Sequence, residues 1–206
     1  MVDAFIKEQW KDLPELNDEF LIASYLKSRS VQSRLKTVKT ALVEAGLTHT
    51  QSHKLATKIL VPFLIPAGTK STIRGCRFNE IISAEIKTCL SKLKMRGVKY
   101  DREKKHDMFH EIPDWIIVRN GKTLVGYNQI SLFGGGHQIN RGSKYVLDDA
   151  LHRKLARMRI KMVCIVKDLP VTQRGKATEI LQKGIKAKRI YCIRGIKKLI
   201  HEYFCA

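Results

Sequence analysis

Apolar residues recur at helical spacing through the first third of the chain, in two stripes separated by polar positions. The first stripe holds Phe20, Leu21, Tyr25 and Leu26, and the second holds Val31, Leu35, Val38, Leu42 and Val43. Gly46 suits the end of the second helix, and Thr48 to Thr50 offer an N-cap for a third helix that ends near Leu60. This spacing predicts an N-terminal helical region over residues 1–67.

The pattern of apolar residues changes after this region. A loop from Pro62 to Thr72 is expected first, followed by a helix over about Phe78 to Met95, whose apolar positions keep the helical period. The segment from Arg96 to His106 is highly charged, so we expect a solvated loop there.

Two β-rich runs flank the dipeptide Asn120-Gly121. The first run is Trp115–Val118 and the second is Thr123–Leu132. Both central positions of a tight type I′ turn need φ > 0, a conformation that asparagine and glycine adopt most readily. We therefore expect a β-hairpin, which places Asp114, at the mouth of the first strand, roughly opposite Tyr127-Asn128-Gln129.

Helical and strand patterns alternate after the hairpin. The expected elements are a helix over 140–159, a strand over 161–166, a helix over 171–183, a strand over 189–193 and a terminal helix after Gly195. Strands that alternate with helices form sheets covered by helices. The sequence thus predicts an α/β fold with a mixed central sheet flanked by helices over residues 68–206, beside the N-terminal helical region.

The chain is strongly basic. It holds 39 Lys+Arg against 19 Asp+Glu, a formal net charge of +20. Residues 1–70 carry 10 basic and 7 acidic side chains, so 29 basic and 12 acidic side chains, net +17, fall in residues 71–206. Such a charge attracts polyanions, of which nucleic acid is the commonest, whereas solubility alone would be served better by acids.

Five cysteines are spread along the chain, and none forms a CxxC pair. A disulfide framework and a zinc site are therefore not expected, and burial as small apolar side chains is the default. The N-terminus shows no apolar stretch typical of a signal peptide or a membrane span. We expect a cytoplasmic, reducing compartment and no membrane partner.

Pro113-Asp114 opens the first strand of the hairpin, and a carboxylate there, with polar residues across the hairpin, suits a divalent cation. Mg²⁺ prefers carboxylate oxygens together with water, and it can generate a hydroxide and stabilise phosphodiester cleavage. Asp114 is the natural ligand. The alternative is a turn-initiating aspartate after proline, with Asn128 and Gln129 as satisfied polar groups of the strand.

The order helix, Pro-Asp strand, Asn-Gly hairpin, helix and apolar strand resembles the PD-(D/E)xK nuclease fold. The segments RGCRFNE before the hairpin and GGGHQINRGSKY after it resemble type II restriction endonucleases, and the resemblance covers about residues 68–200. It implies a restriction-endonuclease-like fold, Mg²⁺ as the cofactor and Asp114 as the central metal ligand.

The second half of the motif departs from the family, because no acid-x-lysine triplet follows. The resemblance aligns Gln129 with the acid position, where an amide oxygen can still ligate Mg²⁺, and Ser131 with the lysine position. A shifted register would put Gly126-Tyr127-Asn128 in place of the triplet. Lys144, or Arg141, would supply the missing positive charge from the following helix.

Glu80 would match the acid that the first helix of this fold often contributes. With the second acid of the motif gone, Glu80 gains importance as a metal ligand. The alternative for Glu80 is an acid in the first helical turn, where the helix dipole favours a negative charge.

Two basic or polar segments suit contacts with DNA. Lys70, Arg74 and Arg77 belong to a glycine-punctuated loop that enters the first helix, an arrangement suited to clamping the phosphate backbone. The polar segment after Gly134-Gly135-Gly136 supplies further expected contacts, namely His137, Gln138, Asn140 and Arg141.

These residues and the resemblance predict a Mg²⁺-dependent endonuclease that cuts double-stranded DNA at a short specific site, a type II site-specific deoxyribonuclease of a restriction-modification system. A chain of this size suits a homodimer, since a two-fold dimer presents two active sites to a two-fold DNA site. Two alternatives remain open. One is a structure-specific repair or recombination nuclease of the same fold, and the other is a catalytically inactive, sequence-specific DNA-binding protein, which the missing acid and lysine favour.

Overall fold

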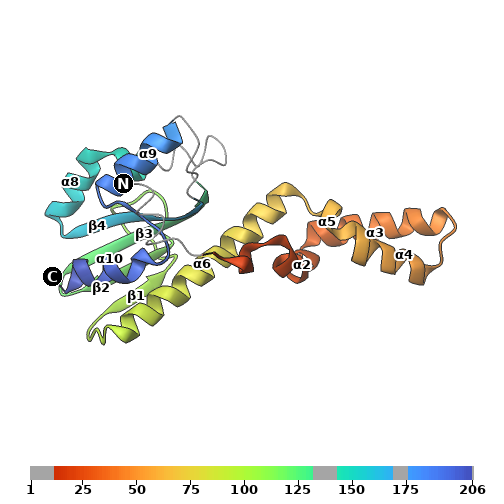
Figure 1. The fold of residues 1–206 in the computed structure, drawn as a ribbon, viewed down its shortest axis with the longest axis horizontal. Coiled ribbons are helices and arrows are strands. Elements are labelled where there is room, and N and C mark those ends of the chain that lie inside the picture. Colours follow the sequence, from red (N-terminus) through yellow and green to blue (C-terminus); the bar gives the residue numbers. More distant parts are fainter. Residues whose placement is uncertain (1–11, 132–142, 169–175, 206) are drawn as a thin grey trace. The chain divides into compact units, whose positions relative to one another are not determined.

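The computed structural model describes residues 12–131, 143–168 and 176–205 (Figure 1). The chain divides into two compact units. One is Leu13–Phe78, and the other is formed by the described residues from Asn79 onward, together with Asp12. The boundary falls inside helix α6 (Ala67–Lys92), which contributes residues to both units.

The first unit is helical, as the sequence predicts. Its elements are η1 (Pro14–Leu16), α2 (Asp18–Leu26), α3 (Arg29–Glu44), α4 (His49–Leu55), η2 (Ala56–Leu60), α5 (Val61–Leu64) and the beginning of α6. Tyr25, Val31 and Leu35, taken from both predicted stripes, are buried in its core. Thr48 caps α4 in a capping box, because its hydroxyl accepts from the Gln51 N–H at 3.2 Å while the Gln51 side chain accepts from the Thr48 N–H at 2.9 Å.

The predicted loop from Pro62 to Thr72 is wrong at both ends, because α5 extends to Leu64 and α6 already begins at Ala67. Gly68 and Gly75 lie inside this helix, where each is expected to destabilise it by about 1 kcal/mol relative to alanine. Packing of the helix outweighs that penalty, and the glycines therefore do not mark a loop. The basic residues assigned to the loop lie on the helix instead.

Over the described residues, the second unit is built on a five-stranded mixed sheet, which confirms the predicted α/β class. Its strands are β1 (Lys99–Arg102), β2 (Trp115–Arg119), β3 (Lys122–Ser131), β4 (Ile160–Asp168) and β5 (Ile190–Tyr191), in that spatial order. The first three strands pair antiparallel, and β4 and β5 add parallel to β3. At the predicted hairpin, Asn120 and Gly121 have φ of 50° and 69°, as a type I′ turn requires.

Strand β1 lies in the segment that we expected to be a solvated loop. Tyr100 pairs with Ile117 of β2, and its hydroxyl donates to Ser83 Oγ of α6 at 2.9 Å. An edge strand exposes one side to water and tolerates charged residues, which protect the edge from further pairing. The high charge of residues 96–106 therefore did not exclude a strand.

Helices cover both faces of the sheet (Figure 1). On one face η3 (Ser143–Leu147), α8 (Asp149–Arg157) and α9 (Lys176–Lys186) enclose a core with alternate residues of β3 and β4, such as Tyr127 and Cys164. Successive residues of a strand point to opposite faces of the sheet. The residues of β3 and β4 that do not belong to this core therefore face α6 and α10 (Gly195–Phe204) on the other side.

The helix predicted over 140–159 is divided in the part that the structure describes. The π-helical turn η3 ends at Leu147, and α8 begins at Asp149. Asp148 separates them, because its carboxylate accepts from the Leu151 N–H at 2.9 Å and caps α8.

The state of the cysteines and the length of the apolar helices can also be read from the structure. All five cysteines are free thiols, and the predicted burial holds for Cys89, Cys164 and Cys192 but not for Cys76 and Cys205. Within the described ranges, no helix is both long and apolar enough to cross a membrane.

Candidate active site

Asp114 immediately precedes the first residue of β2, at the mouth of the strand, where the sequence analysis placed it. Its backbone N–H donates to the Gly126 carbonyl of β3 at 3.1 Å, and its own carbonyl accepts from the Glu103 N–H at 3.2 Å. Pro113 beside it is buried. The main chain of Asp114 is therefore fixed from both sides, which gives its carboxylate a defined position at the sheet edge.

The carboxylate of Asp114 accepts hydrogen bonds from two directions. Oδ2 accepts from the Asn128 backbone N–H at 2.6 Å, across the hairpin, and Oδ1 accepts from Asn79 Nδ2 of α6 at 3.1 Å. The predicted approach of Asp114 to the 127–129 segment is thereby observed. Both donors stabilise the ionised carboxylate.

The two asparagines belong to a hydrogen-bond chain with a fixed direction. Trp115 Nε1 donates to Asn128 Oδ1 at 3.0 Å, and Asn128 Nδ2 donates to Asn79 Oδ1 at 3.0 Å. An indole N–H can only donate and a carboxylate can only accept, so the two ends of the chain determine which way each amide points. The relay Trp115–Asn128–Asn79–Asp114 ties α6 to both strands of the hairpin.

Gly126 makes room for this relay. It lies directly across the hairpin from Trp115, and a Cβ on Gly126 would lie 1.9 Å from Cε2 of the indole. The missing side chain lets the buried ring lie against β3 with its N–H next to Asn128. Sequence reasoning did not identify Asn79 or Trp115 as part of the site, and only the shifted register included Gly126 and Asn128.

Gln129 faces the other side of the sheet from the relay. It pairs with Val166 of β4, on the face where Tyr127 and Val166 are packed under the helices. Its side chain is 5% exposed, and within the described residues neither amide atom has a hydrogen-bond partner. The β3 residue that donates to the Asp114 carboxylate is Asn128, and the role of Gln129 as a metal ligand stays a prediction.

We expect Gln129→Leu to raise the free energy of unfolding by about 1 kcal/mol, because it replaces two buried polar atoms with apolar ones of similar size. If Gln129 is a metal ligand, the same variant loses Mg²⁺-dependent cleavage, while Gln129→Glu retains it. Chemical denaturation and cleavage rates measured on both variants separate the two roles. A destabilised Gln129→Leu that still cleaves at the normal rate would contradict both interpretations.

The other proposed catalytic residues are Glu80, Ser131 and Lys144, and they lie on three different elements. Glu80 follows Asn79 on α6, and its side chain is exposed. Ser131 is the last residue of β3, and its side chain is outside the described part. Lys144 of η3 forms an ion pair with Glu111 at 3.8 Å. Among the described residues, no three His, Cys, Asp or Glu side chains gather closely enough to hold a metal ion.

Only some of the expected DNA contacts lie in the part of the chain that the structure describes. Lys70 and Arg74 lie on α6 within the helical unit, where Lys70 Nζ is 2.8 Å from Asp18 Oδ2. The hydrogen bond from Lys70 is the main cause that lowers the pKa of Asp18. Arg77 is exposed on the same helix. The remaining predicted contacts fall outside the described residues: His137, Gln138, Asn140 and Arg141.

Comparisons with known proteins add little to this geometry. No protein-family model matches the sequence, and no curated protein matches it. Among solved structures, the chain is similar to Can2 from Sulfobacillus thermosulfidooxidans in complex with cyclic tetra-adenylate, with 14% identity and a TM-score of 0.40. The match covers 93% of this chain and 55% of the Can2 chain, so the chain spans about half of that protein. A similarity at this level carries no conclusion about activity.

Proposed function

We propose that this chain is a Mg²⁺-dependent endonuclease that cleaves double-stranded DNA at a short specific sequence, as type II restriction enzymes do. The observation that carries the proposal is the carboxylate of Asp114, held at the sheet edge against Asn79 of α6 and Asn128 of β3. The element order supports it, since a helix, a Pro-Asp strand, a hairpin and a parallel strand follow one another as in the nuclease fold that the sequence resembles. The net charge of +20 suits a DNA substrate.

The donor atoms around Asp114 suit Mg²⁺, a hard cation that prefers oxygen ligands. The carboxylate of Asp114 would bind the ion, with the amide oxygens of Asn79 and Asn128 in the same network as further oxygen donors. Bound Mg²⁺ would lower the pKa of a water molecule and stabilise the charge on the phosphate. In the wider proposal, Glu80, Gln129 and Ser131 remain candidates for ligating the ion or orienting the water.

Lys144 is proposed as the substitute for the lysine that the motif lacks. Its ion pair with Glu111 holds its ammonium group beside the segment that leads into Asp114. From there a cation would stabilise negative charge on the transferred phosphate, a part that neither Gln129 nor Ser131 can play. A homodimer is part of the proposal, because two copies would cut both strands of a two-fold site.

DNA binding is expected to weaken steeply with salt. Each phosphate contact that a cation neutralises contributes about −0.9 to the slope of log K against log salt concentration, and residues 71–206 carry a net charge of +17. Fluorescence anisotropy on a labelled duplex from 50 to 300 mM NaCl, in EDTA to prevent cleavage, measures the slope. A flat dependence would exclude DNA as the main partner.

A second candidate function is DNA binding without cleavage. The relay favours it, because both amide oxygens are already occupied: Asn128 Oδ1 by Trp115 and Asn79 Oδ1 by Asn128. In this case the network serves to lock α6 onto the hairpin, and Asp114 is its terminal acceptor.

One experiment separates these functions. The purified chain is incubated with plasmid DNA, and with synthetic junctions and flaps, in MgCl₂ or in EDTA, and the products are sequenced at their ends. Defined fragments that require Mg²⁺ support the endonuclease. Cutting confined to junctions or flaps indicates a structure-specific nuclease, and a mobility shift without cleavage in MgCl₂ supports the non-cleaving protein.

A further inference from the structure

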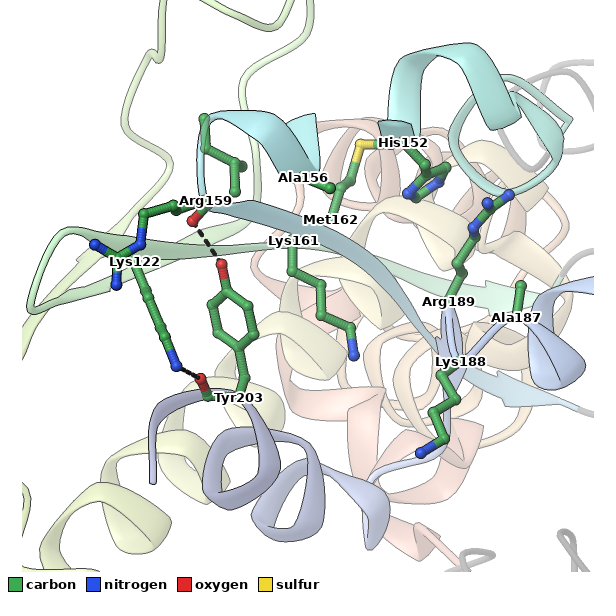
Figure 2. Close-up of a pocket in the computed structure, with 11 residues that line it drawn as sticks. Lys122, His152, Ala156, Arg159, Lys161, Met162, Ala187, Lys188, Arg189 and Tyr203 are labelled. Carbon is green, nitrogen blue, oxygen red and sulfur yellow. Dashed lines mark hydrogen bonds between the residues drawn. The ribbon is translucent and has the colours of Figure 1, made fainter. Parts of the chain in front are cut away.

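A pocket of about 360 Å³ opens at the end of the sheet that is remote from Asp114 (Figure 2). The start of β3 and the start of β4 meet there, since Thr123 pairs with Ile160, whereas Asn128 near Asp114 pairs with Ile165 farther along β4. The volume lies at the lower end of the range for small-molecule sites, about 300–1,000 Å³. The pocket is therefore separate from the candidate active site and large enough for a ligand.

Cationic side chains dominate the lining of this pocket. They are Lys122, Arg159, Lys161, Lys188 and Arg189, and its described lining residues include no Asp or Glu. Carboxylates near the pocket pair with two of the five: Glu202 with Lys188 at 3.8 Å, and Asp149 with Arg189 at 2.6 Å. Within the described residues the other three have no carboxylate ion pair, which leaves an excess of positive charge.

Lys161 is the central cation of the pocket. It extends from β4 into the space between Tyr203 on one side and Lys188 on the other (Figure 2). Its Nζ lies 3.4 Å from the Tyr191 hydroxyl, and burial lowers the pKa of Lys161, with Glu202 opposing that shift. A partly desolvated ammonium whose described hydrogen-bond partner is a neutral hydroxyl is stabilised strongly by an anion.

The backbone at two of the cations is in a conformation that favours glycine. Arg159 has φ of 59° and Lys188 has φ of 54°. Lys188 follows α9 in a Schellman motif, in which its N–H donates to the Ile185 carbonyl at 3.0 Å and the next N–H donates to the Gly184 carbonyl at 2.7 Å. A long side chain at such a position is less stable than glycine, and strained residues of this kind cluster at functional sites.

Apolar and aromatic groups complete the lining. Met162 and Ala156 form part of the wall, and the Tyr203 ring stands beside Lys122, whose Nζ donates to the Tyr203 carbonyl at 3.0 Å. A ligand that fills this space would combine a multiply charged anionic group with a less polar body.

We propose that this pocket binds a phosphate monoester carried on a nucleotide. A doubly charged phosphate matches the Lys and Arg side chains that line the pocket, and the sugar and base match the apolar and aromatic wall. Two kinds of ligand carry such a phosphate monoester: a free mononucleotide, and a nucleic-acid strand with a 5′-phosphate at its end. The proposal does not depend on DNA cleavage at Asp114.

Isothermal titration calorimetry on the full chain tests the site with five probes: AMP, adenosine, inorganic phosphate, and one oligonucleotide with and without a 5′-phosphate. We expect AMP to bind with one site per chain, phosphate to bind more weakly and adenosine not to bind. Tighter binding of the phosphorylated strand than of the unphosphorylated strand identifies a strand end as the source, whereas equal binding of the two strands together with binding of AMP identifies a free nucleotide. Absence of saturable binding by AMP and phosphate, with equal affinities for the two strands, would overturn the proposal.

Variants assign the binding to the pocket. Lys161→Gln is expected to weaken AMP binding about ten- to hundredfold, as loss of a charge-assisted hydrogen bond does. Lys154→Gln is the matched control, because Lys154 is exposed on α8 and does not line the pocket. Equal affinities in these two variants would refute the assignment. Asp114→Asn is expected to leave AMP binding unchanged, so failure of the nuclease proposal does not affect this test.

Glycine substitution at the strained positions separates ligand binding from a structural role. Arg159→Gly and Lys188→Gly are expected to raise the melting temperature, since glycine adopts φ > 0 without strain, and to weaken AMP binding. A raised melting temperature with unchanged binding would show that these two cations do not contact the ligand. These variants also carry the test if Lys161→Gln does not fold.

Discussion

Replacing Asp114 by asparagine or alanine is expected to abolish Mg²⁺-dependent cleavage of DNA, with a loss of about 10³-fold or more in rate. The Asp114 carboxylate lies at the mouth of β2, where it accepts hydrogen bonds from Asn79 of α6 and from Asn128 of β3. Removal of its negative charge takes away the anionic oxygen ligand on which positioning of the ion depends. Single-turnover cleavage of a supercoiled plasmid measures the effect.

The same substitution tests the relay through stability. Asparagine at this position must turn its NH₂ group toward one of two donors, the Asn128 N–H or Asn79 Nδ2. Two N–H donors then face each other and one of them has no acceptor. We expect this to lower the free energy of unfolding by about 1–3 kcal/mol, which chemical denaturation measures. Asp107→Asn, the same chemical change at an exposed position, serves as the control for both measurements. Cleavage at the normal rate by a folded Asp114→Ala variant would refute the nuclease proposal.

The largest expected loss of stability is for Gly126→Ala. The added Cβ would lie 1.9 Å and 2.0 Å from two carbons of the Trp115 ring, whose side chain is 1% exposed. The indole cannot move aside within a packed core without displacing its neighbours. We therefore expect a loss of about 3 kcal/mol or more in the free energy of unfolding, at the upper end of overpacking effects.

Gly75→Ala is the matched control for this prediction. A Cβ at Gly75 of α6 meets nothing within 4 Å, and alanine favours the helix over glycine by about 1 kcal/mol. The control is thus expected to stabilise the helix slightly. Thermal unfolding followed by circular dichroism compares the two variants. A Gly126→Ala protein as stable as the parent would mean that the indole does not lie against β3, and the relay would lose its first donor.

Local side-chain chemistry determined the secondary structure at the hairpin turn and at the start of α4. Asn120-Gly121 specified the hairpin turn, because few other dipeptides adopt two positive φ angles. Thr48 and Gln51 specified the start of α4 through a reciprocal pair of hydrogen bonds between near neighbours. The turn and the capping box each depend on residues within a few positions of one another, so both can be predicted from the sequence without knowledge of the tertiary structure.

Local signals failed where tertiary packing decided the outcome. Glycines at 68 and 75 suggested a loop, yet the helix α6 continues through them. The charges of residues 99–102 suggested a loop as well, but pairing with β2 supplies hydrogen bonds that composition does not reveal. In both cases contacts with distant residues outweighed a local preference of about 1 kcal/mol or less.

The geometry of the candidate site was likewise determined in part by the sequence and in part by the tertiary structure. The sequence by itself determined that Asp114 stands at a strand mouth, opposite the polar segment of β3, because a two-residue turn fixes the register of the hairpin. Only the tertiary structure decided that Asn128, and not Gln129, meets Asp114, and that Asn79 arrives from α6, 35 residues away in sequence. Adjacent strand residues point to opposite faces, so the choice depends on which face a distant helix covers.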